Sequence, residues 1–167
     1  YTIAKFYRID GGSTQNKGVA PDISFPTPVA PEETGESREV NALPWDKIAS
    51  ANYEKLGNFA SLLPKLQSAH DARIAKDPEF AYVMQDIADY KEEKDKKSVS
   101  LNEAERVAEQ AKQDEKALKR TNERLARLGK PAVKSLDELP ADFEAPDEYL
   151  IEAANITADL VKVSKRS

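Results

Sequence analysis

Few residues in this sequence have the types and spacings that catalytic or metal chemistry needs. His70 is the single histidine and cysteine is absent, which excludes disulfides, Cys-ligated metals and a thiol nucleophile. Any metal motif with two histidines, and any triad that uses a histidine base, would have to rest on His70 alone. His70 falls on the apolar face of an expected helix, so we interpret it as a hydrogen-bonded core histidine.

A glycine-rich loop at residues 11–18 is superficially similar to a phosphate-binding loop. Its glycines do not have the spacing of a P-loop, in which backbone N–H groups surround the phosphates. Pro21 and Asp22 also follow where the helix of that motif would have to begin. We therefore reject a nucleotide site in this loop.

Paired carboxylates are the remaining candidates for acid and base chemistry. Glu32 and Glu33 lie in an expected linker, and Glu92 and Glu93 lie on an expected charged helix, so neither pair has a pocket in which to work. We assign no catalytic, cofactor-binding or metal-binding residue in this sequence, and we expect no cofactor.

Length and composition indicate the class of molecule. The chain has 167 residues, enough for one ordinary domain, and its 33% charged residues and mean hydropathy of −0.67 indicate a thin core beneath solvated helix faces. Because 30 Asp and Glu residues outnumber 25 Lys and Arg residues, binding to a nucleic acid backbone is not expected. No apolar run approaches the roughly 20 residues that a transmembrane helix requires.

The first 25 residues are typical of β-structure. Residues 2–9 are rich in β-branched and aromatic side chains, Gly11 and Gly12 then break the pattern, and residues 19–25 form a second extended piece. Two isolated strands are marginal in water, so we expect them to be the remnant of a larger sheet. The chain begins at Tyr1 inside the first strand, from which we expect that an upstream part of the protein, with any targeting segment, has been removed.

A proline-rich linker is expected at residues 26–44. Trp45 follows this linker, and we expect its ring to fasten the linker to the helical part of the chain. Asp46 is a plausible N-cap for the first helix of a helical domain that spans residues 45–167.

Two closely spaced helices are predicted after the linker. Pro64 suits a first helical turn, and Asp77 followed by Pro78 is a typical cap and start for the next helix. Helices joined so tightly should pack as a hairpin or at a sharp angle. The expected apolar faces recur at spacings of three and four and comprise Leu63, Leu66, Ala69, His70 and Ile74 in the first helix, and Phe80, Val83, Met84, Ile87 and Tyr90 in the second.

One long charged helix is predicted from Ser100 to about Leu128. The Ser100 and Glu103 pair resembles a capping box, and Gly129 and Pro131 end the helix. Mixed charges favour a solvated helix with i,i+4 pairs. A weak seven-residue seam runs through Ala104, Ala111, Leu118 and Leu125, with Val107, Asp114, Thr121 and Leu128 three residues further on.

A last helix should begin near Asp147. Its expected apolar face comprises Leu150, Ala153, Ala154, Thr157, Leu160 and Val161. The predicted fold class is mainly α, an irregular multi-helix domain with one long charged helix, preceded by a short β remnant.

Several segments resemble a known family. Residues 2–8, 11–15 and 17–23, which read TIAKFYR, GGSTQ and KGVAPDI, closely resemble the end of the protease domain in the carboxy-terminal processing peptidases. Residues 41–46 (NALPWD) and 70–80 (HDARIAKDPEF) are similar to the C-terminal helical extension of one branch, the tail-specific proteases of Gram-negative bacteria.

The resemblance implies a periplasmic serine endopeptidase that engages apolar C-terminal tails through a PDZ domain. In that family a Ser nucleophile is activated by a Lys base, which burial can keep neutral. Both residues lie upstream of the strand with which this chain opens, so neither can be assigned here. We therefore expect that the chain by itself cleaves nothing.

The resemblance also implies roles for the helical extension. Residues 1–25 would be the end of the protease domain, and residues 45–167 would pack around the protease body and shape access to its active site. The expected partners are the PDZ and catalytic domains, protein substrates, and a tetratricopeptide-repeat lipoprotein adaptor of the kind that partners such proteases. The long charged helix is the expected contact surface.

A second hypothesis is a self-contained interaction or adaptor domain, unrelated to proteolysis, in which the seam of the long helix pairs with another helix. The expected sheet remnant and linker argue against it, because an independent adaptor has no need of orphan strands.

Overall fold

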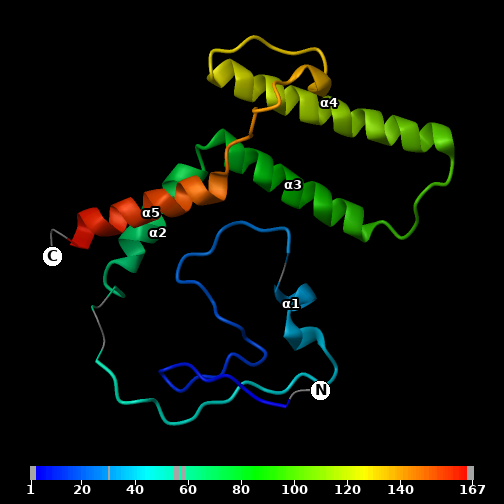
Figure 1. Cartoon of the computed structure of the whole chain (residues 1–167). Coiled ribbons are helices and arrows are strands. Elements are labelled where there is room, and N and C mark those ends of the chain that lie inside the picture. Colours follow the sequence, from blue (N-terminus) through cyan, green and yellow to red (C-terminus); the bar gives the residue numbers. More distant parts are fainter. Residues whose placement is uncertain (1–2, 30, 55–56, 58, 165–167) are drawn as a thin grey trace. The chain divides into compact units, whose positions relative to one another are not determined.

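The computed structural model describes residues 3–29, 31–54, 57 and 59–164, and it is mainly α, as predicted. The chain forms two compact units, Tyr1–Lys91 with Glu148–Ser167, and Glu92–Asp147. The elements in Figure 1 are α1 (Pro31–Thr34), η1 (Glu36–Arg38), α2 (Leu63–Ile74), α3 (Pro78–Asp95), α4 (Glu103–Arg127), η2 (Leu136–Glu138) and α5 (Glu148–Ser164).

The expected β remnant is wrong as secondary structure. Within the described residues the N-terminal segment forms no strand, only isolated antiparallel bridges between Tyr7 and Ser13 and between Gly12 and Lys47. Ile3 and Phe6 are 84% and 80% exposed, so they lack the partner face that a strand buries. A β-pattern without neighbouring strands to complete its ladder does not form a sheet.

Asp46 does not cap a helix, contrary to expectation. The first helix after it, α2, starts only at Leu63. The intervening residues 46–51 run in extended form against the glycine-rich loop, where the backbone N–H groups of Ile48 and Ala51 donate to the carbonyl oxygens of Gly11 and Ile9. The segment that follows Trp45 is therefore hydrogen-bonded to the glycine-rich loop, which precedes it in the sequence.

The boundaries of α2 and α3 follow the predicted signals. Pro64 lies in the first turn of α2, and the Asp77 carboxylate accepts a hydrogen bond from the backbone N–H of Glu79 at 2.7 Å, capping α3. Of the two expected arrangements of α2 and α3, the hairpin is not formed, because α2 packs against α5 (Figure 1). On α3, Phe80 and Ile87 are buried, whereas Met84 and Tyr90 are 55% and 43% exposed.

The start of α4 differs from the expected capping box. Asn102, not Ser100, is the N-cap, and its side-chain oxygen accepts hydrogen bonds from the backbone N–H groups of Ala104 at 2.9 Å and Glu105 at 3.3 Å. The Ser100 hydroxyl instead accepts from the N–H of Asn102 at 3.2 Å. Asn is as good a cap as Ser, and Asn102 lies closer to the first apolar residue.

We expect Asn102→Ala to destabilise unit Glu92–Asp147 by about 1 kcal/mol, because two N–H groups at the start of α4 lose their acceptor. Helicity of α4 followed by amide hydrogen exchange is the direct measurement. Ser100→Ala is the matched control and should cost less, because Ser100 satisfies only one N–H outside the helix. Equal effects of the two substitutions would contradict the assignment of the cap.

The end of α4 matches the prediction. Gly129 has φ of +66°, its N–H donates to Ala126, and the N–H of Lys130 donates to Leu125. These are the two hydrogen bonds of a Schellman motif, which needs a residue with positive φ.

The predicted seam of α4 is only half correct. Leu125 and Thr121 are buried, but Val107 is 61% exposed and Ala104 and Ala111 are exposed. The buried half is covered by the segment after the helix, where Asn122 exchanges two hydrogen bonds with the backbone of Val133 at 2.8 and 3.0 Å. The first half of α4 is thus the exposed, charged part.

The buried face of α5 is not the predicted one. Leu150, Ile151 and Val161 are 66%, 50% and 48% exposed, while Glu152 is only 3% exposed. The apolar residues of α5 were assigned to the core by their spacing alone. Because Glu152 bonds to His70 and Arg73 on α2, the face of α5 that carries Glu152 points inward.

Candidate functional site

His70 is a buried, hydrogen-bonded core residue, as predicted. Its side chain is 1% exposed, and its Nδ1 lies 2.9 Å from Oε1 of Glu152 on α5, 82 residues later in the chain. Because a carboxylate can only accept, Nδ1 carries the proton of this hydrogen bond. His70 therefore holds α5 against α2.

Arg73 lies one turn after His70 and binds the same carboxylate. Its Nε lies 3.0 and 2.9 Å from the two Glu152 oxygens, and its Nη2 lies 2.7 Å from Oε1. Its Nη1 reaches Asp159, two turns further along α5, at 2.5 Å. One guanidinium thus spans two carboxylates of α5 with the planar geometry that arginine provides.

Burial and pairing act in opposite directions on Glu152. Burial alone would raise the pKa of Glu152, but hydrogen bonds from Arg73 and His70 outweigh it, so the pKa of this carboxyl lies below its usual value. Hydrogen bonding from Arg73 lowers the pKa of Asp159, and bonding to Glu152 raises the pKa of Arg73. Both carboxylates are therefore ionised in the native network.

An aromatic cluster covers this network. The Phe25 ring centroid lies 5.2 Å from that of His70, 6.4 Å from that of Phe80 and 5.8 Å from that of Tyr149. Phe80 and Tyr149 meet edge to face at 5.9 Å. Such tilted and edge-to-face pairs are the favourable arrangements of aromatic rings.

The network has the chemistry of a structural joint. Both oxygens of Glu152 accept from Arg73, so neither is left to act as a base on a substrate. His70, 1% exposed, contacts a ring on one side and this carboxylate on the other. General acid or base catalysis needs a group within reach of a substrate proton, which this closed arrangement does not offer.

The network predicts a loss of stability in acid. Since the pKa values of Glu152 and Asp159 are lower in the folded chain than their usual values of 4.5 and 3.8, their contribution is fully present above about pH 4.5. It is lost as the pH falls through the lowered folded values. The midpoint of urea unfolding should therefore be flat from pH 7 to 5 and fall below pH 4.5. A midpoint that stays level down to pH 3 would contradict the pairing.

The glycine-rich loop forms a second cluster with the Trp45 segment, which we call the clasp. The indole N–H of Trp45 donates to the carbonyl of Ser13 at 2.9 Å, and the N–H of Ser13 donates to the carbonyl of Asp46 at 3.0 Å. The Ser13 hydroxyl accepts from the N–H of Asp46 at 3.3 Å. Lys17 Nζ lies 4.2 Å from the centre of the Trp45 ring, a cation–π contact.

Charged side chains close the clasp on its outer side. The Asp46 carboxylate accepts from the Tyr7 hydroxyl at 3.0 Å and pairs with Lys5 at 3.2 Å. The hydrogen bond to Asp46 raises the pKa of Tyr7. Glu36 accepts from the Gln15 side chain and, at 2.8 Å, from the backbone N–H of Asn16. The polar groups that a phosphate would need in this loop are thus engaged within the chain.

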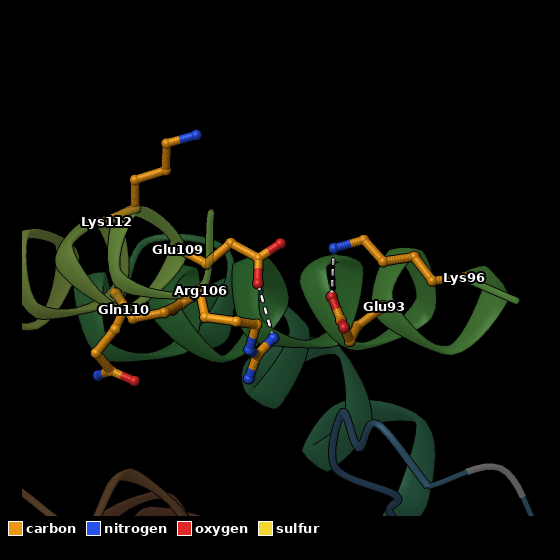
Figure 2. A pocket seen from close by; sticks show the side chains of 7 residues that line it. Glu93, Lys96, Arg106, Glu109, Gln110 and Lys112 are labelled. Atoms are coloured by element: carbon orange, nitrogen blue, oxygen red, sulfur yellow. Dashed lines mark hydrogen bonds and ion pairs between the residues drawn. The ribbon is translucent and has the colours of Figure 1, made fainter. Parts of the chain in front are cut away.

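A polar hollow of about 340 Å³ lies in unit Glu92–Asp147 (Figure 2). Glu93 pairs with Lys96 at 2.6 Å, and Arg106 pairs with Glu109 at 2.8 Å. Lys112 extends away from the other labelled side chains in Figure 2. Exposed pairs of this kind contribute little to stability, so these charges are available to a partner.

Metal-ligand clusters and membrane-spanning helices are both absent from the described residues. Among those residues no group of three or more His, Asp or Glu side chains is placed to hold a metal ion. None of the helices there is both long enough and apolar enough to cross a bilayer.

Sequence reasoning missed the partners of His70. Glu152 has a usable signal, because it is one acid inside an otherwise apolar run from Leu150 to Ala154. Arg73 has a weaker one, its position one turn after His70 on the same face. Asp159 and Tyr149 carry no such signal, since surface acids and tyrosines are common on helices.

Comparison with known proteins identifies relatives along nearly the whole chain. Residues 29–162 match the family model described as the C-terminal domain of tail-specific protease. The tail-specific protease of Haemophilus influenzae is 51% identical over 164 residues, which cover 96% of this chain and 24% of that protein. The chain thus spans about a quarter of the length of this relative. On these grounds the chain belongs to the family of C-terminal domains of tail-specific proteases.

Proposed function

We propose that this chain is the non-catalytic C-terminal helical region of a periplasmic serine endopeptidase that degrades or processes proteins from their C-terminal tails. Residues 1–25 are the end of its protease domain, residues 26–44 a linker, and residues 45–167 the helical domain. The helical domain supports the PDZ and catalytic domains.

The observation that carries the proposal is 51% identity to a tail-specific protease across nearly the entire chain. The site geometry supports the non-catalytic part, because His70 and Glu152 are committed to holding α2 and α5 together. A domain whose polar core is used for cohesion suits a scaffold better than a reaction centre.

The test uses the full-length protease with the region after Ile23 deleted. Cleavage of a C-terminally tagged unfolded protein is compared with cleavage of a short reporter peptide. Loss on the protein substrate alone means that the helical domain handles substrate or adaptor, and loss on both means that the catalytic domain needs it as a scaffold. Unchanged activity on both substrates would overturn the proposal in favour of an independent adaptor domain.

The exposed first half of α4 is the surface that we propose for contacts with substrate or with a tetratricopeptide-repeat lipoprotein adaptor. Arg120 and Arg124 lie in the second half of α4 and are half-buried, so substituting them would disturb packing as well as any contact with a partner. Arg106 and Lys112 are exposed and line the hollow in Figure 2.

Charge reversal at these two residues in the full-length protease should weaken adaptor binding and slow cleavage of the tagged protein. Cleavage of the reporter peptide should not change, because the peptide needs no such surface. Retained adaptor binding and protein cleavage after reversal would rule out this surface.

A further inference from the structure

We propose that residues 3–26 are a docking strap that fastens the preceding domain at two anchors, at Phe25 and Pro26 to the helical core and at Ser13 to the Trp45 segment that leads into it. The inference rests on the proposed function, in which residues 1–25 end the protease domain. It adds a specific attachment to that function, one that motif and family comparison do not indicate.

The first anchor is an aromatic and proline pair that enters the helical core. Phe25 touches His70 on α2, Phe80 on α3 and Tyr149 on α5, so one side chain meets three helices. The Tyr149 hydroxyl donates a hydrogen bond to the carbonyl oxygen of Pro26 at 2.9 Å.

The first anchor lies just before the residues that match the family model. The family match begins at residue 29, so Phe25 and Pro26 lie before the matched domain and yet contact its helices. Phe80 and His70, which the Phe25 ring contacts, are the two largest fully buried side chains among the described residues. The helical domain therefore presents a receptor for a Phe-Pro dipeptide supplied by the segment before it.

The second anchor is the clasp. Ser13 exchanges backbone hydrogen bonds and a hydroxyl contact with the Trp45 and Asp46 segment, which belongs to the matched domain. Ser13 and Gln15 are 3% and 8% exposed, although they lie in a loop. The upstream loop is thus built against the helical domain's own leading segment.

Two anchors restrict the orientation of the preceding domain more than one anchor would. A single contact between domains permits rotation about it, whereas two contacts 12 residues apart, at Ser13 and Phe25, fix an orientation. Once one anchor is engaged, the other binds as an intramolecular ligand at high effective concentration. The strap therefore ties the preceding domain both to the α2, α3 and α5 core and to the Trp45 segment that leads into it.

The test follows amide hydrogen exchange in the full-length protein with Phe25→Ala and Trp45→Ala, singly and together. Phe25→Ala should raise exchange in α2 and α5 by about tenfold or more, because the half-buried Phe25 ring packs against His70 on α2 and Tyr149 on α5. Trp45→Ala should do the same at residues 9–15. The double variant should show both increases together.

Phe59→Ala is the matched control, because Phe59 is 51% exposed and belongs to neither anchor. Unchanged exchange in α5 with Phe25→Ala and at residues 9–15 with Trp45→Ala, or the same increases in the control, would overturn the strap. If Phe25→Ala does not fold, Tyr149→Phe removes only the hydrogen bond to Pro26 and should raise exchange in α5, which carries Tyr149, about two- to fivefold. No change there would also overturn the first anchor.

The exchange measurement is independent of proteolysis. If the anchor variants raise exchange as expected but deletion of the region after Ile23 leaves cleavage unchanged, the strap stands and the proposed function is rejected. If the anchor variants leave exchange unchanged but the deletion abolishes cleavage, the strap is rejected and the proposed function stands.

Discussion

Replacing Glu152 by alanine is expected to lower the free energy of unfolding of the helical core by about 2–4 kcal/mol. The substitution leaves the Nδ1–H of His70 buried without its acceptor and removes the main partner of Arg73. We place the cost below that of breaking a fully buried pair, because Arg73 is 30% exposed and keeps Asp159 as a partner. The midpoint and slope of urea unfolding, monitored by far-UV circular dichroism at pH 7, measure this effect.

Glu148→Ala is the control for loss of a glutamate from the same helix. Glu148 lies in the first turn of α5, where an acid contributes a helix-dipole interaction of about 0.3–1 kcal/mol. A Glu152→Ala variant no less stable than Glu148→Ala would show that the network does not hold α5 in place. A double-mutant cycle with Arg73→Ala should give a coupling energy of at least about 1 kcal/mol.

The acid dependence separates the network from simple loss of packing. Wild-type stability should fall below about pH 4.5, because the unfolded chain then takes up protons at Glu152 and Asp159 that the native network resists. Glu152→Gln should show a weaker fall, because one of the two titrating groups is gone. An unchanged pH profile in this variant would assign the acid sensitivity to other carboxylates.

The sequence predicts helix boundaries well where local chemistry decides them. Pro64, Asp77 and Gly129 each act within one turn through ring constraint, capping or positive φ, and each lies where it was expected. Ser100 failed as a cap because Asn102 offers the same chemistry nearer to the helix.

Packing partners could not be predicted in the same way. The pairing of α2 with α5 depends on His70 and Glu152, which are 82 residues apart, and no local signal specifies such a contact. The spacing of apolar residues pointed to Leu150 and Val161 as core, yet they are 66% and 48% exposed. Periodicity identifies a helix face, but which face is buried depends on partners far along the chain.

The candidate site shows the same division. The core role of His70 follows from its place on an apolar helix face, whereas Arg73 and Asp159 are ordinary surface types until the fold brings them together. The β-pattern of residues 2–9 misled for a related reason. Strand propensity describes fit to a sheet, and it forms no strand where partner strands are lacking.

Replacing Gly11 by alanine is expected to open the clasp. Gly11 has φ of +83°, a conformation that costs a residue with a Cβ atom about 1–2 kcal/mol. In addition, a Cβ at this position would lie 2.1 Å from the carbonyl oxygen of Ile48 and 3.1 Å from the N–H nitrogen of Ser50. Both are backbone atoms, so the clash is relieved only if residues 46–51 move away from the loop.

That displacement breaks a defined set of contacts. The hydrogen bond from Ile48 to the carbonyl of Gly11 is lost first, and the bonds between Ser13 and Asp46 lie immediately beside it. We expect amide exchange at residues 9–15 and 46–51 to rise by at least about a hundredfold, equivalent to roughly 3 kcal/mol, while α2 and α5 keep their protection. Fluorescence of Trp45 should shift to longer wavelength, because its ring becomes more exposed to water when the contact with Ser13 opens.

Gly18→Ala separates the two causes within the same loop. Gly18 also has positive φ, +62°, but a Cβ there would meet no atom within 4 Å. Its substitution therefore carries the backbone strain without the collision and should cost only about 1 kcal/mol. A Gly11→Ala variant that behaves like Gly18→Ala would mean that the Ile48 segment does not press on the loop. A larger effect at Gly11, confined to the clasp, would establish that the leading segment of the helical domain is built against the loop before it.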